Sequence, residues 1–194
     1  QFGGLIDRNV RESGIRSVML PLDTPVDELT DFDAIIISGG PKSVNDDDAP
    51  DCDHGIFESG KPILGVCYGM QLMAKHLGGE VVASDIREDG PMPTKFTGGS
   101  RLFSGLEDRP QKVLMSHGDK VQKLPSGFKI IGGLGDMISA IENPGQRLYA
   151  TQFHPEVFQT ECGPDIFQNF LKNIAGLEAD YTTEDQEQEA IQNI

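Results

Sequence analysis

The stretch PILGVCYGMQ, residues 62–71, predicts a buried strand that runs directly into a helix. Its apolar run ends at Cys67, and Gly65 and Gly69 stand two positions to either side. In a strand-to-helix corner of this kind, the nucleophile elbow, the central residue has strained backbone angles and the glycines remove side chains that would collide. The first amides of the helix favour a thiolate there. The pattern predicts a reactive sulfur.

A lone cysteine in an apolar run is more often a small core residue, so a nearby base is needed to decide. QFHPEV, residues 152–157, offers one. In an extended segment residues i and i+2 point the same way, so Glu156 is expected beside His154, where its carboxylate can orient the imidazole. Cys67, His154 and Glu156 fit a triad of nucleophile, base and acid.

Backbone amides near the elbow are candidates for an oxyanion hole. The amide of Tyr68 follows the nucleophile, and Gly40 of SGGP, residues 38–41, could bring a second amide close. A plain turn would explain the same glycines. Gln71 lies one helical turn after Cys67, and its side chain either reads a polar substrate or faces solvent.

Outward from the elbow, short continuous apolar runs predict buried parallel strands. These runs are residues 17–20, 34–38 and 62–66. Leu5, Ile6 and Val10 fall on one side of a first helical segment, which a glycine four positions later can close. Residues 70–77 repeat the helical spacing. The alternation predicts an α/β fold with a mostly parallel, open sheet covered by helices.

The second half of the chain changes character. Four apolar runs predict strands with little helix between them, which favours mixed or antiparallel additions to the sheet. They are residues 112–116, 128–133, 137–142 and 147–153. A last apolar helix face is expected over 164–174. The domain is expected to span residues 1–175, followed by a polar, acidic linker or tail over 176–194.

Charge and cysteine usage narrow the classes of partner. Sixteen basic against thirty-one acidic side chains give a net charge of −15, which repels nucleic acid and anionic membranes. No stretch approaches the roughly 18 consecutive apolar residues of a membrane span. Three widely spaced cysteines do not suit a disulfide framework, so a reducing, cytoplasmic location is expected.

Five aspartates crowd residues 46–53, and a solvated loop is the simpler explanation for them. A metal site is the alternative, but the stretch lacks the spacing, the glycine and the glutamate of a calcium loop. His54 and His76 are expected to be surface residues. His117 is expected to shape a pocket through its backbone more than through its ring.

SGGP, GVCYGMQ and QFHPE occur together in the order and spacing of the class I glutamine amidotransferases, and the chain resembles that family over residues 1–175. Within the family, REDG (87–90), SHGD (116–119) and HPEVFQTECG (154–163) are most similar to the amidotransferase part of GMP synthases. The resemblance implies a flavodoxin-like fold. It also implies that this domain needs no metal or cofactor.

The resemblance implies hydrolysis of L-glutamine to glutamate and ammonia. Cys67 would form a γ-glutamyl thioester, with His154 as acid and base and Glu156 as its orienting group. The amides of Gly40 and Tyr68 would hold the oxyanion. The positions that match the family's binding residues for the glutamine head group are Gln71, Ser116, Gly118 and Asp119.

In the full enzymes that this resemblance indicates, ammonia passes to an ATP-pyrophosphatase or synthetase domain. There ATP and Mg²⁺ serve the conversion of XMP to GMP. Residues 176–194 resemble the start of the connection into that domain. Family members also have an apolar strand before the QFG of residues 1–3, so the sequence is expected to begin after its first strand and to leave strand edges unpaired.

Three alternatives stay open. The chain could be the amidotransferase of another pathway, such as anthranilate, carbamoyl phosphate or CTP synthesis. It could be a catalytically silent docking or regulatory module of the same fold, although the complete set of cysteine, histidine and glutamate argues against this. It could also be a different cysteine hydrolase with the same elbow, for instance a γ-glutamyl peptidase.

Overall fold

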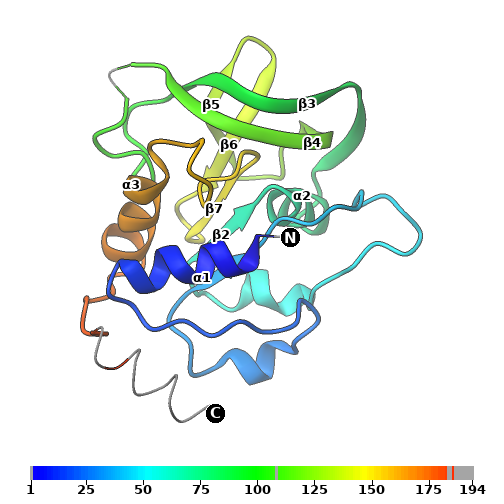
Figure 1. The fold of residues 1–194 in the computed structure, drawn as a ribbon. Helices are drawn as coiled ribbons and strands as arrows, with labels where there is room; N and C mark the ends of the chain where they lie inside the picture. The colour runs from blue at the N-terminus through cyan, green and yellow to red at the C-terminus, as the bar shows by residue number, and fades with distance from the viewer. Residues whose placement is uncertain (1, 108, 183–184, 186–194) are drawn as a thin grey trace.

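The computed structural model of the chain describes residues 2–107, 109–182 and 185, which are built around a seven-stranded mixed sheet (Figure 1). The strands lie in the order β1-β2-β7-β6-β5-β3-β4. They are β1 (Ile35–Ile37), β2 (Ile63–Val66), β3 (Glu80–Phe96), β4 (Gln111–Lys123), β5 (Lys129–Leu134), β6 (Met137–Asn143) and β7 (Leu148–Thr151). The helices are α1 (Gly3–Glu12), α2 (Tyr68–His76), α3 (Gly163–Gln168) with a π-helical continuation (Asn169–Ile174), and the 3₁₀ helices η1 (Val26–Leu29) and η2 (His54–Glu58).

Parallel pairing is confined to the part of the sheet that carries the elbow. There β2 pairs in parallel with β1 on one side and with β7 on the other. The pairings β7–β6, β6–β5, β5–β3 and β3–β4 are antiparallel. The α/β class and the antiparallel additions in the second half are confirmed. The expectation of a mostly parallel sheet is wrong for the described strands, because four of the six pairings are antiparallel.

Helices cover both faces of the sheet. Because successive residues of a strand point to opposite faces, Leu64 and Val66 lie in the core beneath α1 and α3, whereas Ile63 lies in a second core beneath α2. A strand between two helical layers must be apolar on both faces, which explains the continuous apolar run of β2. All described helices are too short or too polar to span a bilayer.

The helical segments mostly follow their sequence patterns. In α1, Ile6 and Val10 are buried, but Leu5 is exposed, so its expected place on the buried side is wrong. Gly14 closes this segment with a φ of +77°, which glycine adopts without strain. The apolar face expected over 164–174 is buried, and its last turn is π-helical.

One expected strand is absent from the described sheet, and one strand of the sheet has no counterpart among the expected ones. Residues 17–20 form no strand there, and Val18, Met19 and Leu20 are exposed. An apolar run becomes a strand only where a neighbouring strand satisfies the hydrogen-bonding groups of its backbone. The additional strand is β3, whose sequence contains Pro91 and Pro93. Most of β3 pairs with β4 alone, so the prolines, which lack an N–H, can face the edge that has no partner strand.

The described part of the expected linker returns to α1. The amide of Tyr181 donates to the carbonyl oxygen of Gly14 at 3.0 Å, and Arg11 donates to the Tyr181 hydroxyl at 2.6 Å. The first residues after the domain therefore lie against the body of the protein. Residues 183–184 and 186–194 of the expected linker lie outside the described residues.

Candidate active site

Cys67 occupies the corner between β2 and α2 with a φ of +52° and a ψ of −101°. This left-handed conformation is uncommon for residues other than glycine. Its amide donates to the carbonyl oxygen of Thr151 at 2.7 Å, which ties the corner to β7. A Cβ at Gly69 would lie 2.3 Å from the carbonyl oxygen of Ile37, and one at Gly65 would lie 2.7 Å from that of Gly69. Backbone contact thus explains both glycines of the predicted elbow.

His154 and Glu156 follow a bend at residues 152–153 after β7, and Glu156 lies in a turn rather than in an extended strand. His154 Nδ1 lies 2.7 Å from Glu156 Oε1, and both side chains are buried. The His154 amide donates to the Leu114 carbonyl at 3.0 Å, and the Thr160 hydroxyl donates to the His154 carbonyl at 2.7 Å. The expected contact between imidazole and carboxylate is present, and β4 helps to hold it.

The thiol and the imidazole meet beside Gly39. A Cβ at Gly39 would lie 2.8 Å from His154 Cε1 and 3.4 Å from Cys67 Cβ, so a larger residue would intrude on the pair. Burial by itself lowers the pKa of His154, but hydrogen bonds with Cys67 and Glu156, together with their charges, raise it to about 9. The protonated form of the His154 imidazole is therefore favoured at neutral pH.

The predicted oxyanion donors lie at this corner. The amides of Met70 and Gln71 donate to the Cys67 carbonyl, whereas the amide of Tyr68 opens α2 and has no acceptor within its own helix. A Cβ at Gly40 would lie 3.4 Å from the Tyr68 ring, so the Gly40 backbone runs against that residue. Their role in holding an oxyanion stays a prediction.

The structure brings together only some of the predicted substrate-binding side chains. Gln71 Nε2 donates to the carbonyl oxygen of Asp119 at 3.1 Å, and Asp119 Oδ2 is buried without a hydrogen-bond partner among the described residues. Ser116 and Gly118 alternate with Asp119 along β4 and face the other way, and the Ser116 hydroxyl donates to Asp89 at 3.0 Å. The Ser116 carbonyl nevertheless lies 3.8 Å from Cys67 Sγ.

Gln152 is a site residue that the sequence analysis missed. Its buried amide nitrogen lies 3.7 Å from Cys67 Sγ, and its Oε1 lies 3.5 Å from Gln71 Nε2. It therefore links the thiol to the residues expected to bind the substrate. The available signal was its position two residues before His154, just after the last residue of β7.

The His117 ring contributes more to the site than the sequence analysis expected. It is buried on the same face of β4 as Asp119, with Nδ1 2.7 Å from the Asp119 carbonyl and Nε2 3.1 Å from Glu88 Oε2. Burial lowers the pKa of His117, although the charge of Glu88 opposes this. The ring, and not only the backbone of His117, therefore shapes this side of the site.

The residues of the site are buried in this conformation: Cys67, Gln71, Asp119 and His154 are each at most 9% exposed. Two surface pockets, of about 560 and 190 Å³, are lined by residues within 95–138 and 44–75, and Cys67 lines neither of them. A cluster that could ligate a metal, Asp51, His54 and His76, lies at the other end of α2.

Known proteins share both this sequence pattern and this fold. The family model of class-I glutamine amidotransferases matches residues 1–174. The chain is 46% identical to a GMP synthase [glutamine-hydrolyzing] of Syntrophomonas wolfei and 44% identical to one of Oleidesulfovibrio alaskensis, over 100% and 94% of its own length. It spans only 38% and 36% of those relatives.

A solved structure agrees with these relatives. The chain superposes on a protein of Thermoplasma acidophilum described as a putative subunit of GMP synthase, with a TM-score of 0.82 and 28% identity. The alignment covers 100% of this chain and 93% of that one. From the match over residues 1–174 and the elbow that the structure contains, the chain belongs to the class-I glutamine amidotransferase family.

Proposed function

We propose that this chain hydrolyses L-glutamine to glutamate and ammonia through a γ-glutamyl thioester on Cys67. The observation that carries the proposal is the buried, hydrogen-bonded series Cys67, His154 and Glu156 at a corner with positive φ. Membership of the amidotransferase family supports the same reaction.

In the first half-reaction the Cys67 thiolate attacks the side-chain amide carbon of glutamine. The C–N bond breaks as the His154 imidazolium gives its proton to the departing nitrogen, so ammonia leaves and the thioester remains. The amides of Gly40 and Tyr68 stabilise the negative charge on the tetrahedral oxygen. Glu156 keeps the imidazole oriented and stabilises its charged form.

The second half-reaction consumes water. His154, now neutral, takes a proton from a water molecule whose oxygen attacks the thioester carbonyl. The C–S bond breaks, glutamate forms, and Cys67 leaves as a thiolate beside the reprotonated imidazole. Both halves move a proton at His154, which explains why the group is buried between Cys67 and Glu156.

Recognition of the glutamine head group is assigned to the residues predicted for it: Gln71, Ser116, Gly118 and Asp119. Asp119 is suited to the substrate ammonium, because its buried Oδ2 has no hydrogen-bond partner among the described residues. Gln71 and Gln152 link the backbone carbonyl of Asp119 to the thiol.

The ammonia is assigned to a synthetase that converts XMP to GMP with ATP and Mg²⁺. The support is the identity of 46% and 44% to two GMP synthases. ATP and Mg²⁺ would act in the synthetase and not at Cys67. The buried thiols of Cys52, Cys67 and Cys162 suit a reducing, cytoplasmic setting.

Because Cys67 and His154 are buried here, we expect glutamine to reach them only after the site opens. A synthetase that stabilises the open form would couple ammonia production to its own state, in proportion to its preference for that form. We therefore expect the chain alone to hydrolyse glutamine slowly, and faster when the synthetase is added.

The test is glutamate release from glutamine by the chain with and without a synthetase, compared with Cys67→Ala. The proposal expects turnover to fall at least ~10³-fold in Cys67→Ala, since no other group forms the thioester. Equal turnover in the two proteins would overturn it.

Assays with other substrates distinguish this proposal from the alternative functions. A γ-glutamyl peptide hydrolysed faster than glutamine would identify a peptidase. Failure of Cys67 to react with a glutamine-like electrophile faster than free cysteine does would favour a silent docking module. Ammonia transfer to a substrate other than XMP would place the chain in another pathway.

A further inference from the structure

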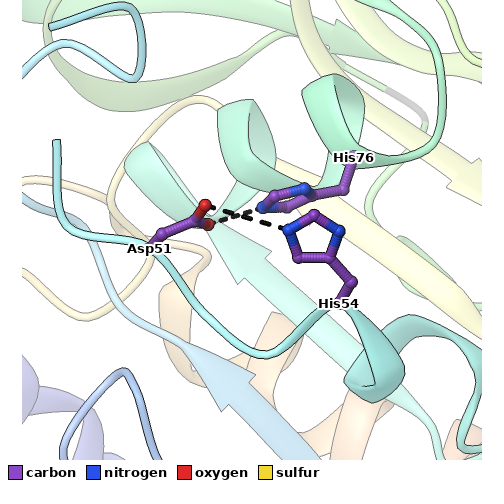
Figure 2. A group of neighbouring side chains, drawn as sticks. All are labelled: Asp51, His54 and His76. Atoms are coloured by element: carbon purple, nitrogen blue, oxygen red, sulfur yellow. Dashed lines mark hydrogen bonds and ion pairs between the residues drawn. The ribbon is translucent and has the colours of Figure 1, made fainter. Parts of the chain in front are cut away.

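A second cluster of polar side chains lies at the C-terminal end of α2 (Figure 2). Asp51 lies shortly before η2, His54 opens η2, and His76 ends α2. Asp51 Oδ1 is 2.6 Å from His76 Nε2, and Asp51 Oδ2 is 3.9 Å from His54 Nε2. The His76 side chain is only 8% exposed, so its expected place on the surface is wrong. One ligand atom from each residue lies within 4.8 Å of the others.

We propose that Asp51, His54 and His76 bind a divalent transition cation of the zinc class. Two imidazole nitrogens and one carboxylate oxygen suit zinc, whereas magnesium and calcium prefer oxygen ligands. Three protein ligands also leave a fourth position for water. The sequence pattern argued against a calcium loop in residues 46–53, and this ligand set is of a different kind because two of its members are histidines.

Binding would require the side chains to turn. Around a tetrahedral zinc with bonds of about 2.0–2.1 Å, ligand atoms lie about 3.4 Å apart. The 2.6 Å contact of Asp51 Oδ1 with His76 must open, and ligand atoms that now lie as much as 4.8 Å apart must draw together. The side chains of His54 and Asp51 are 71% and 56% exposed, so they can turn without disturbing the core.

The surroundings favour a cation. The C-terminal end of a helix carries a partial negative charge, and His76 is the last residue of α2. Nearby cationic side chains have other partners: Lys42 pairs with Asp48, and Lys75 donates to the Val44 carbonyl. The neighbouring Asp53 is occupied as well, since it accepts from two backbone amides at the start of η1 and η2.

A bound ion would fasten this segment to the helix that positions the nucleophile. Pro50, next to Asp51, accepts a hydrogen bond from the hydroxyl of Tyr68, the first residue of α2. The segment thus contacts both ends of α2. A nine-residue helix is about 14 Å long, so the ion would lie far from the reacting atoms and would stabilise the structure without joining the chemistry.

The experiment is calorimetric titration of the full chain with Zn²⁺, in a Cys67→Ser background that removes the thiol as a competing ligand. We expect one ion per chain and a higher melting temperature with Zn²⁺, but not with Mg²⁺. His54→Asn and His76→Asn should each weaken binding at least ~10-fold. Asp47→Asn, which changes an exposed acid of the same loop, should leave binding unchanged.

Two results would overturn the proposal. One is the absence of stoichiometric Zn²⁺ binding in the Cys67→Ser chain, which would leave the cluster as a hydrogen-bonded pair with a neighbouring histidine. The other is equal binding by the His54→Asn variant, which would place the ion elsewhere. Glutaminase activity is not the readout, so failure of this proposal and failure of the proposed function are distinguishable.

Discussion

The two sides of the active site are built by different physical means. On the elbow side, contacts between backbone atoms fix Cys67, and neither Gly65 nor Gly69 leaves room for a side chain. On the β4 side, three of the four expected substrate-binding residues lie on an antiparallel strand whose pairing with β3 contains register shifts. The reacting atoms are thus held by the sheet, and the binding residues by one pair of strands.

One buried polar atom sets the binding side apart. The buried side-chain atoms without a hydrogen-bond partner among the described residues are Glu88 Oε2, His117 Nε2, Asp119 Oδ2 and Glu156 Oε2. Glu88 Oε2 and His117 Nε2 lie 3.1 Å apart as an ion pair, and Glu156 holds His154 through its other oxygen. Because buried polar groups are normally satisfied, Asp119 Oδ2 suits a position that a ligand completes.

The largest effect is expected from Gly69→Ala. The new Cβ would lie 2.3 Å from the Ile37 carbonyl oxygen, and backbone of β1 cannot move aside cheaply. We expect the free energy of unfolding to fall by about 3 kcal/mol or more. A shift of the sulfur by about 1 Å costs on the order of 10²-fold in rate. The weakened fold also lowers the amount of folded enzyme, so the combined loss of turnover should exceed that of the variants below and approach background.

Gly4→Ala in α1 is the matched control for denaturant unfolding and turnover. Nothing lies within 4 Å of a Cβ at Gly4, so alanine should stabilise this helix by up to ~1 kcal/mol and leave turnover unchanged. Normal stability and turnover in Gly69→Ala would show that backbone contact does not fix the elbow.

Glu156→Gln should have the next largest effect. The amide keeps the size of the side chain but loses the charge that orients and stabilises the His154 imidazolium. We expect kcat to fall on the order of 10³-fold, with KM little changed. Glu161→Gln, at an exposed position of the same segment, is the control, and steady-state kinetics with equal losses in both variants would contradict the assignment.

The same variant has a signature in the pH dependence of stability. His154 has a folded pKa of about 9, above its ordinary 6.5, so its stabilising contribution is complete below pH 6.5 and is lost as pH rises through 9. The difference in unfolding free energy between wild type and Glu156→Gln should therefore shrink between pH 6.5 and 9. A difference that stays constant across this window would contradict the charged pair.

On the binding side, Asp119→Asn should act on KM. Loss of a carboxylate that pairs with the substrate ammonium should raise KM about 10–100-fold and change kcat much less. Asp136→Asn, at an exposed position, is the control. A fall in kcat without a rise in KM would assign Asp119 to the reactive side and erase the contrast between the two sides.

The features that the sequence could predict are those made by residues close together in the chain. The elbow depends on residues adjacent in the chain, so the spacing of Gly65, Cys67 and Gly69 is enough to predict the corner. The contact of His154 with Glu156 is also local, although a bend and a turn, and not a strand, provide it.

Contacts made by tertiary pairing were not predictable in this way. Gln152 reaches Cys67 only because β7 pairs with β2, and His117 meets Glu88 only through the pairing of β4 with β3. The run at residues 17–20 has strand composition, but composition does not supply a neighbouring strand. The sequence of β3 does not look like that of a strand, because it contains Pro91 and Pro93. A proline is tolerated in a strand only at an edge without a partner strand, and the sequence does not show which edge that is.

The smallest effect is expected from Gln152→Met, which tests the link between the two sides. Methionine keeps the approximate volume but removes the N–H that donates to Cys67 Sγ at 3.7 Å. A long contact to sulfur is weak, so we expect alkylation of Cys67 by iodoacetamide at pH 7 to slow only about 5-fold. Gln122→Met, at an exposed position of β4, should leave the alkylation rate unchanged. Equal alkylation rates in Gln152→Met and the wild type would show that the Gln152 side chain does not act on the sulfur.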